Sequence, residues 1–240
     1  MSQLRVENIA KGFKKLQVVK GISFSVKSSE VVGLLGPNGA GKTTSFYIVV
    51  GLLKPDRGEV FLDEREISSL PMYQRARIGL SYLPQEVSIF RRLTVAENIL
   101  VALEAHGYTG SDKMERLDRL LTEFRIDHIR SNYGYSLSGG ERRRVEISRA
   151  LAGESKFLLL DEPFAGIDPL AAGDIQEVVL QLKAKGIGVL ITDHNVRETF
   201  GICDRVHILK EGRIEVEGTT EEVAQSPVAR KFYLGENFIL

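Results

Sequence analysis

The sequence has one cysteine, Cys203, among its 240 residues, and it lacks long hydrophobic runs. No disulfide can form within one chain, and this composition fits a reducing compartment. The longest apolar stretches, such as 48–53 and 157–160, are far shorter than the about 20 residues that cross a bilayer as a helix. The first 14 residues contain no such run either, so we expect no secretory signal. A membrane role would therefore be peripheral and act through a partner.

An excess of charge of one sign is also missing, because 32 basic side chains balance 32 acidic ones. Nothing attracts the whole molecule to nucleic acid or anionic lipid, and we expect no nucleic-acid partner. The sequence shows no internal repeat, low-complexity segment or linker. With 43% hydrophobic and 27% charged residues it has the composition of an ordinary soluble protein, long enough for one large domain or a core with an inserted subdomain.

Short apolar runs predict strands that are buried on both faces, as in a parallel sheet. These runs are Val31–Leu35, Phe157–Leu160 and Gly188–Ile191. A helix expected over 171–185 would join the last two strands in a β-α-β crossover. Another helix is expected from Lys42 to about Gly51. Alternating apolar and polar residues near the N-terminus predict a small antiparallel sheet, formed by segments 4–9, 18–26 and 59–62.

The middle of the chain is rich in Arg, Glu and Leu and has no strand-like run. Helices are expected there over 94–105, 113–124 and 141–151. We therefore predict one α/β domain, residues 1–240, whose core (1–84 and 152–240) carries an inserted helical subdomain (85–151). Segment 219–233 also predicts helix, with Pro227 able to start a new one. The apolar tail around Phe238 and Leu240 has two interpretations, a subunit contact or a frayed terminus.

A phosphate-binding loop follows the first buried strand and has the sequence Gly36-Pro37-Asn38-Gly39-Ala40-Gly41-Lys42-Thr43-Thr44. The glycines allow the backbone to point several N–H groups inward, toward an anion. Lys42 places a cation at the β- and γ-phosphates, and the Thr43 hydroxyl can bind Mg²⁺. The following helix directs its positive end at the phosphates. An ordinary glycine-rich turn is the alternative, and the strand before and helix after the loop count against it.

Two acidic residues, Asp161 and Glu162, stand at the end of the second buried strand. Asp161 is expected at the carboxyl edge of the sheet, where ligands of open α/β sheets bind, and is suited to hold Mg²⁺. Glu162 is placed to take a proton from an attacking water. On its own such a pair also fits a helix N-cap. The phosphate-binding loop favours the catalytic interpretation.

The pentapeptide Leu137-Ser138-Gly139-Gly140-Glu141 resembles the signature motif of ABC transporter ATP-binding subunits. Ser138 offers a hydroxyl, Gly139 and Gly140 permit close backbone approach, and the helix that begins at Glu141 favours an anion at its start. The resemblance covers the whole chain and implies a P-loop NTPase (ABC ATPase) core. It also implies that the motif meets the nucleotide of a second copy, in a head-to-tail homodimer with two ATP molecules at the interface.

The same resemblance implies roles for three further residues. Gln85 corresponds to the glutamine that senses Mg²⁺ and the attacking water, and His194 to the switch histidine that contacts the γ-phosphate. Phe13 corresponds to an aromatic residue that stacks on adenine. The alternatives are a polar loop residue, a structural histidine and a core phenylalanine. The implied cofactors are ATP and Mg²⁺, with Gln85, Glu162 and His194 as catalytic residues and Thr43, Asp161 and Gln85 at the metal.

Longer segments resemble the ATPase subunits of bacterial lipopolysaccharide exporters, namely 82–93, 138–144, 161–169, 192–200 and 233–238. This implies an ATP-hydrolysing translocase subunit on the cytoplasmic face of the inner membrane, which contacts the membrane indirectly. Two transmembrane permease subunits are implied as partners. We expect them to dock near Phe90 and Arg91, because an aromatic side chain beside basic residues can anchor a partner helix. The alternative is that Phe90 packs within the helical subdomain.

Three other functions stay open at this point. Segment 164–169 argues against the first, the ATPase of a branched-chain amino-acid importer. The single cassette, the absence of heptads and the zero net charge argue against the second, a non-transport ABC ATPase acting on DNA or ribosomes. The third is a nucleotide-binding enzyme such as a kinase, in which the signature pentapeptide would have no role.

Overall fold

The larger of two sheets has six strands in the order β10-β9-β3-β8-β7-β6. Neighbouring strands from β9 to β6 are parallel, and β10 is antiparallel to β9. The computed structural model describes residues 1–238, except for the side chains of residues 169 and 170. The strands are β3 (Val31–Leu35), β6 (Leu80–Leu83), β7 (Phe157–Asp161), β8 (Gly188–Thr192), β9 (Arg205–Lys210) and β10 (Arg213–Thr219). Every residue of β3, β7 and β8 is buried, which explains their uninterrupted apolar sequences.

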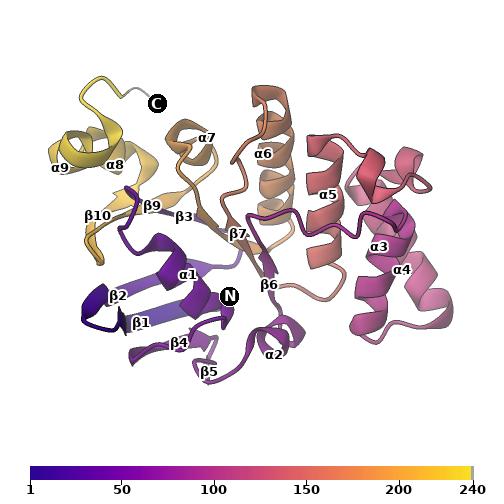
Figure 1. Ribbon diagram of the computed structural model, residues 1–240, viewed down its shortest axis with the longest axis horizontal. Coiled ribbons are helices and arrows are strands. Elements are labelled where there is room, and N and C mark those ends of the chain that lie inside the picture. Colours follow the sequence, from indigo (N-terminus) through magenta and orange to yellow (C-terminus); the bar gives the residue numbers. More distant parts are fainter. Residues whose placement is uncertain (239–240) are drawn as a thin grey trace.

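The smaller sheet is antiparallel and has the order β2-β1-β4-β5. Its strands are β1 (Gln3–Phe13), β2 (Leu16–Lys27), β4 (Arg57–Leu62) and β5 (Arg65–Glu66). Helix α1 (Lys42–Val50) packs against both sheets in one hydrophobic cluster (Figure 1). This position between two apolar surfaces explains why α1 has buried side chains on most of its circumference.

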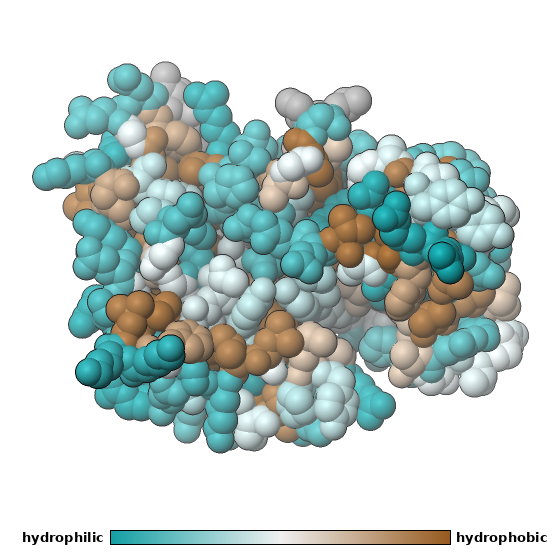
Figure 2. Space-filling view, in the orientation of Figure 1, coloured by the Kyte–Doolittle hydropathy of each residue, from teal (hydrophilic) through white to brown (hydrophobic). Residues whose placement is uncertain are grey.

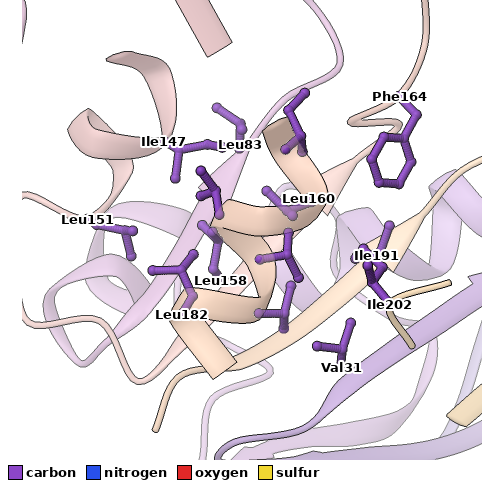
Figure 3. Close-up of a cluster of buried hydrophobic side chains, with 14 of the residues drawn as sticks. Val31, Leu83, Ile147, Leu151, Leu158, Leu160, Phe164, Leu182, Ile191 and Ile202 are labelled. Atoms are coloured by element: carbon purple, nitrogen blue, oxygen red, sulfur yellow. The ribbon is translucent and has the colours of Figure 1, made fainter. Parts of the chain in front are cut away.

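Helices cover the opposite face of the larger sheet. Figure 3 shows apolar side chains from the strands, such as Leu158 and Leu160, packed against α6 (Pro169–Ala184), which contributes Leu182. Ile147 joins them from α5 (Gly139–Ala150). On the far side of α5 lie α3 (Val95–Ala105) and α4 (Gly110–Glu123), which form the lobe at the right of Figure 1. The 3₁₀ turns are η1 (Asp127–Ile129) and η2 (Gly134–Ser136).

Short helices complete the chain. Helix α2 (Met72–Arg77) precedes β6, and α7 (Val196–Phe200) follows β8. Beyond β10 come α8 (Thr220–Gln225), α9 (Pro227–Ala229) and the π-helical turn η3 (Arg230–Leu234). Phe238 is buried against Phe200 of the same chain, with ring centroids 5.3 Å apart. The interpretation as a frayed terminus is therefore wrong for Phe238, the subunit contact stays a prediction, and Leu240 lies outside the described residues.

The α/β fold and the strands and helices predicted from the sequence are confirmed, including a new helix at Pro227. Six elements were not predicted from the sequence, namely β5, β6, β9, β10, α2 and α7. These elements are short or carry mixed sequences: β10 lies at an edge and alternates between exposed and half-buried residues, and β9 holds the buried His207. The division of the chain at residues 85 and 151 stays a prediction. Among residues 1–238, no helix has the length and apolar character needed to cross a membrane.

Candidate active site

The phosphate-binding loop joins β3 to α1, and its glycines are required by close backbone neighbours. Gly36 and Gly41 have φ values of 145° and 98°, in the region that favours glycine. A Cβ atom at Gly36 would lie 2.2 Å from the Leu209 carbonyl oxygen. One at Gly41 would lie 2.9 Å from the Val18 carbonyl oxygen. The loop therefore rests directly on the backbone of β2 and β9, and a side chain at either glycine would displace it.

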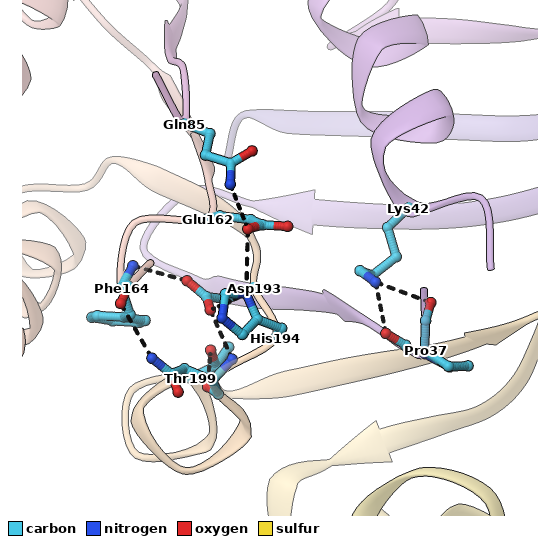
Figure 4. Close-up of polar contacts among 10 residues, drawn as sticks. Pro37, Lys42, Gln85, Glu162, Phe164, Asp193, His194 and Thr199 are labelled. Carbon is cyan, nitrogen blue, oxygen red and sulfur yellow. Dashed lines mark hydrogen bonds and ion pairs between the residues drawn. The ribbon is translucent and has the colours of Figure 1, made fainter. Parts of the chain in front are cut away.

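Lys42 lies at the first position of α1 with its ammonium group inside the curve of the loop. Its Nζ donates to the carbonyl oxygens of Gly36, at 2.7 Å, and Pro37, at 3.1 Å (Figure 4). Burial lowers the pKa of Lys42, while the carboxylates of Glu162, Asp193 and Asp161 act in the opposite direction. The ammonium is thus held beside a group of negative charges at the carboxyl edge of the larger sheet.

Asp161 ends β7 with only 3% of its surface exposed. Burial and the neighbouring Glu162 raise the pKa of Asp161 from 3.8 to about 6, although Tyr82 donates a hydrogen bond to it. The ionised form of such a buried carboxylate is unfavourable on its own, so a cation beside it stabilises it. Thr43, exposed in the first turn of α1, presents a hydroxyl. These hard oxygen donors fit Mg²⁺, which uses one or two protein ligands together with phosphates and water.

Glu162 is the point at which the three predicted catalytic residues meet. One of its carboxylate oxygens accepts a hydrogen bond from Gln85 Nε2 at 2.8 Å and lies 3.3 Å from His194 Nδ1 (Figure 4). Glu162 has a φ of 45°, an uncommon value for a residue other than glycine. Its backbone N–H donates to the Thr192 carbonyl, so the end of β8 fixes this turn. The structure brings these residues together, and their catalytic roles stay predictions.

Asp193 lies under His194, is fully buried and was not predicted as a site residue from the sequence. Its carboxylate accepts hydrogen bonds from the backbone N–H groups of Phe164, at 2.8 Å, and Asn195, at 2.7 Å. Burial raises the pKa of Asp193, which these hydrogen bonds partly offset. A signal for Asp193 was present in the sequence, because it directly follows the buried strand β8, just as Asp161 ends the buried strand β7. Through its two hydrogen bonds Asp193 fixes the turn that contains Phe164 and the turn that contains Asn195.

Ser138 is the N-cap of α5 and forms a capping box with Glu141. Its hydroxyl donates to the Glu141 carboxylate at 2.7 Å. Within residues 1–238, no hydrogen bond joins Ser138, Gly139 or Gly140 to the phosphate-binding loop, and Figure 1 shows the start of α5 well apart from α1. Phe13 is 46% exposed at the end of β1, with Lys11 Nζ 6.0 Å from its ring centroid. The signature motif is thus exposed and separate from the phosphate-binding loop of its own chain, and the ring of Phe13 is also exposed.

The sequence profile of the family described as ABC transporter matches residues 19–165. The chain is 54% identical to the "Lipopolysaccharide export system ATP-binding protein LptB" of Haemophilus influenzae, and the alignment covers the full length of both proteins. It is 51% identical, again over both full lengths, to the protein of the same name from Escherichia coli strain K12.

Solved structures share the fold. The ADP conformation of MJ1267, an ATP-binding cassette of an ABC transporter, superposes with a TM-score of 0.86 at 31% identity, over 98% of this chain and 100% of that one. The "Dimeric structure of a post-hydrolysis state of the ATP-binding cassette MJ0796 bound to ADP and Pi" has a TM-score of 0.78 at 25% identity, over 90% of this chain and 98% of that one.

We predict that replacing Asp161 by asparagine stabilises the fold near neutral pH in the absence of Mg²⁺ and nucleotide. The folded-state pKa of about 6 exceeds the ordinary 3.8. The protonated form therefore favours folding below about pH 4, and this contribution is lost as the pH rises through about 6. Above that, the ionised carboxylate costs about 1–3 kcal/mol relative to the neutral amide of asparagine.

Urea unfolding of both proteins at about pH 7.5 and about pH 4.5 measures this difference. The free energy of unfolding of D161N should exceed that of the wild type at the higher pH, with a smaller gain at the lower pH. The exposed Asp112→Asn serves as the control and should show no such dependence. A D161N gain that is equal at both pH values would contradict the assignment.

Proposed function

The chain belongs to the ABC transporter family and is an ATP-hydrolysing subunit, and on this premise we propose that it drives the export of lipopolysaccharide. In this proposal it powers extraction from the inner membrane and transport toward the outer membrane. The observation that carries the cargo assignment is the 54% identity over full length to an ATP-binding protein of a lipopolysaccharide export system. The contact of Glu162 with Gln85 and His194 supports hydrolysis at this site.

In the proposed reaction the phosphate-binding loop holds the phosphates of ATP through its backbone N–H groups, and Lys42 neutralises their charge. Glu162 takes the proton of the attacking water, while Gln85 and His194 orient the water and the γ-phosphate. Thr43 and Asp161 would hold Mg²⁺, which when bound neutralises charge that develops on the phosphates. Phe13 would stack on the adenine.

We further propose that two copies form the active unit, with Ser138, Gly139 and Gly140 of each completing the site of the other. The exposure of the signature motif, and its separation from the phosphate-binding loop of its own chain, support this arrangement. The capping box gives the start of α5 a fixed shape before any partner arrives. Two tetra-anionic nucleotides at one interface need cations around them, so closure should depend on ATP with Mg²⁺.

The proposed docking surface for transmembrane subunits is the groove between the two lobes. The groove has a volume of about 510 Å³ and lies between α2 and β6 on one side and α3 and α5 on the other. It forms the notch at the lower right of Figure 2. Phe90 lies at its rim, 47% exposed, with the Arg149 guanidinium 4.7 Å from its ring centroid. Asn98 holds the Phe90 backbone, so the ring is presented outward.

In this proposal the protein lies in the cytoplasm, peripheral to the inner membrane, and contacts the membrane through its partners. Arg91 is exposed beside Phe90 and can meet acidic groups of a partner helix. The groove is built from both lobes, so an inserted helix would touch α5, whose first residues carry the signature motif. Docking and nucleotide binding are therefore connected through one helix.

Replacing Glu162 by Gln should preserve ATP binding and lower turnover about 10²–10⁴-fold, because glutamine keeps the shape but cannot accept the proton. Steady-state ATPase assays and a fluorescent ATP analogue measure the two properties separately. The exposed Glu64→Gln is the matched control and should retain wild-type activity. Turnover of E162Q within about tenfold of the wild type would disprove the role of Glu162.

Mixing two inactive variants tests whether the signature motif acts on the other subunit. Ser138→Arg should bind ATP without hydrolysing it. Lys42→Ala should be inactive because it lacks the cation that neutralises the phosphates of ATP. In a mixed dimer one site has both an intact loop and an intact signature motif. An equimolar mixture should therefore recover up to about a quarter of wild-type ATPase activity, since half of the dimers are mixed and each has one complete site. No recovery would mean that both elements act within one chain.

Phe90→Ala should weaken assembly with the transmembrane subunits while the purified subunit keeps its ATPase activity. Loss of a buried aromatic anchor costs about 2 kcal/mol, or about 30-fold in affinity. Co-purification from detergent-solubilised membranes measures assembly, and Met114→Ala, an exposed apolar residue on α4, is the control. Mass spectrometry of the wild-type complex identifies the partners. Permeases of an amino-acid importer would contradict the proposed cargo, and loss of ATP binding in F90A would contradict the docking role.

A further inference from the structure

The end of the hairpin formed by β1 and β2 lies beside the phosphate-binding loop. Phe13, the last residue of β1, pairs with Leu16, the first residue of β2. Further along β2, the Val18 carbonyl oxygen lies so close to Gly41 that a Cβ atom there would be 2.9 Å away. The position of the hairpin end therefore sets where the Phe13 ring stands relative to the loop.

This hairpin end has little regular strand pairing to hold it. On one side, the register of β1 against β2 shifts between Lys11 and Gly12, and Lys14 in the turn has a φ of 55°. On the other side, β4 pairs with β1 as far as Ala10, which lies opposite Arg57, and within residues 1–238 no strand pairs with this side beyond that point. Contacts from outside the strand ladder therefore have to hold the last residues of β1.

Asp56, the residue before β4, supplies those contacts. Its backbone N–H donates to the Ala10 carbonyl oxygen at 2.8 Å. One carboxylate oxygen accepts from Lys11 Nζ at 2.8 Å, and the other accepts from the Gly12 N–H, also at 2.8 Å. The hydrogen bond from Lys11, and then the one from Gly12, hold the pKa of Asp56 below its ordinary value, so the carboxylate is charged at neutral pH. Asp56 therefore contacts each of the three residues that precede Phe13.

The Asp56 side chain acts on the Phe13 ring in two ways. Through Gly12 it fixes the backbone from which the ring projects. Through Lys11 it holds a cation whose Nζ lies 6.0 Å from the ring centroid, at the limit of a cation–π contact. The Asp56 side chain is 48% exposed, and an exposed ion pair of this kind contributes little to the free energy of unfolding. Its removal should therefore free the ring without unfolding the sheet.

We propose that Asp56 is a positioning residue of the nucleotide site, whose carboxylate holds Phe13 where its ring stacks on adenine. The inference rests on the proposed stacking role of Phe13, and Asp56 acts through that residue. The phosphates have separate support, because the loop rests on the backbone of Val18 and Leu209 and Lys42 lies inside its curve. Loss of the Asp56 carboxylate should therefore weaken binding of the adenine part of ATP and leave the phosphate contacts and the chemical step unchanged.

The test compares Asp56→Ala with the wild type in steady-state ATPase assays of the full-length protein. We expect KM for ATP to rise about threefold or more with kcat within about twofold, because the variant loses binding that is equal in the ground and transition states. Inorganic tripolyphosphate carries phosphates without the base, so its inhibition constant should stay within about twofold of the wild-type value. Glu7→Ala removes another acidic side chain of the same sheet that is 48% exposed in an ion pair, and it should leave KM unchanged.

Phe13→Ala and the double variant D56A/F13A show whether Asp56 acts through the ring. F13A should raise KM for ATP, and the double variant should have the same KM as F13A, because the group that Asp56 positions is already absent. A rise in KM of D56A below about threefold, an equal weakening of tripolyphosphate, or effects that multiply in the double variant would overturn the role of Asp56. If F13A itself keeps the wild-type KM, the proposed stacking on adenine is wrong, so the two failures are distinguishable in one set of assays.

Discussion

The structure depends on one electrostatic constraint, the presence of three carboxylates and one buried ammonium group at the same edge of the larger sheet. Asp161, Glu162 and Asp193 come from the ends of β7 and β8, and Lys42 comes from the head of α1, where its charge and theirs influence one another. Burial disfavours the charges of Asp161, Asp193 and Lys42, as the raised pKa of both aspartates and the lowered pKa of the lysine show. Such a site favours a ligand that brings phosphates for the lysine and a cation for the carboxylates.

Backbone contacts, as much as side chains, hold these charged groups in place. The phosphate-binding loop rests on the carbonyl groups of Val18 and Leu209, and the turn after β7 is tied to the end of β8. Asp193 holds both neighbouring turns through backbone N–H groups. The charged groups are thus carried by segments that cannot move independently, which is the preorganisation that a phosphoryl-transfer site needs.

Helix α5 connects this site to the proposed docking groove. The Arg143 guanidinium donates to the Pro84 carbonyl at 3.0 Å, next to Gln85. The Glu146 carboxylate accepts from Ser88 N–H at 2.7 Å, and Arg149 donates to the Ser88 carbonyl at 2.7 Å. Because the signature motif begins the same helix, a displacement of α5 also displaces the segment between Gln85 and Phe90.

The sequence alone determined the elements whose signal is local. Continuous apolar strands, the glycine pattern of residues 36–41 and the pentapeptide at 137–141 indicated the fold, the nucleotide and the family, because each requires particular residues at fixed spacing. Only the tertiary structure decided which distant groups meet. The contact of Gln85 with Glu162 spans 77 residues, and the contact of Ser88 N–H with the Glu146 carboxylate spans 58. Such meetings are set by the order of strands in the sheet, and a short or mixed strand such as β6 or β9 leaves little trace in the sequence.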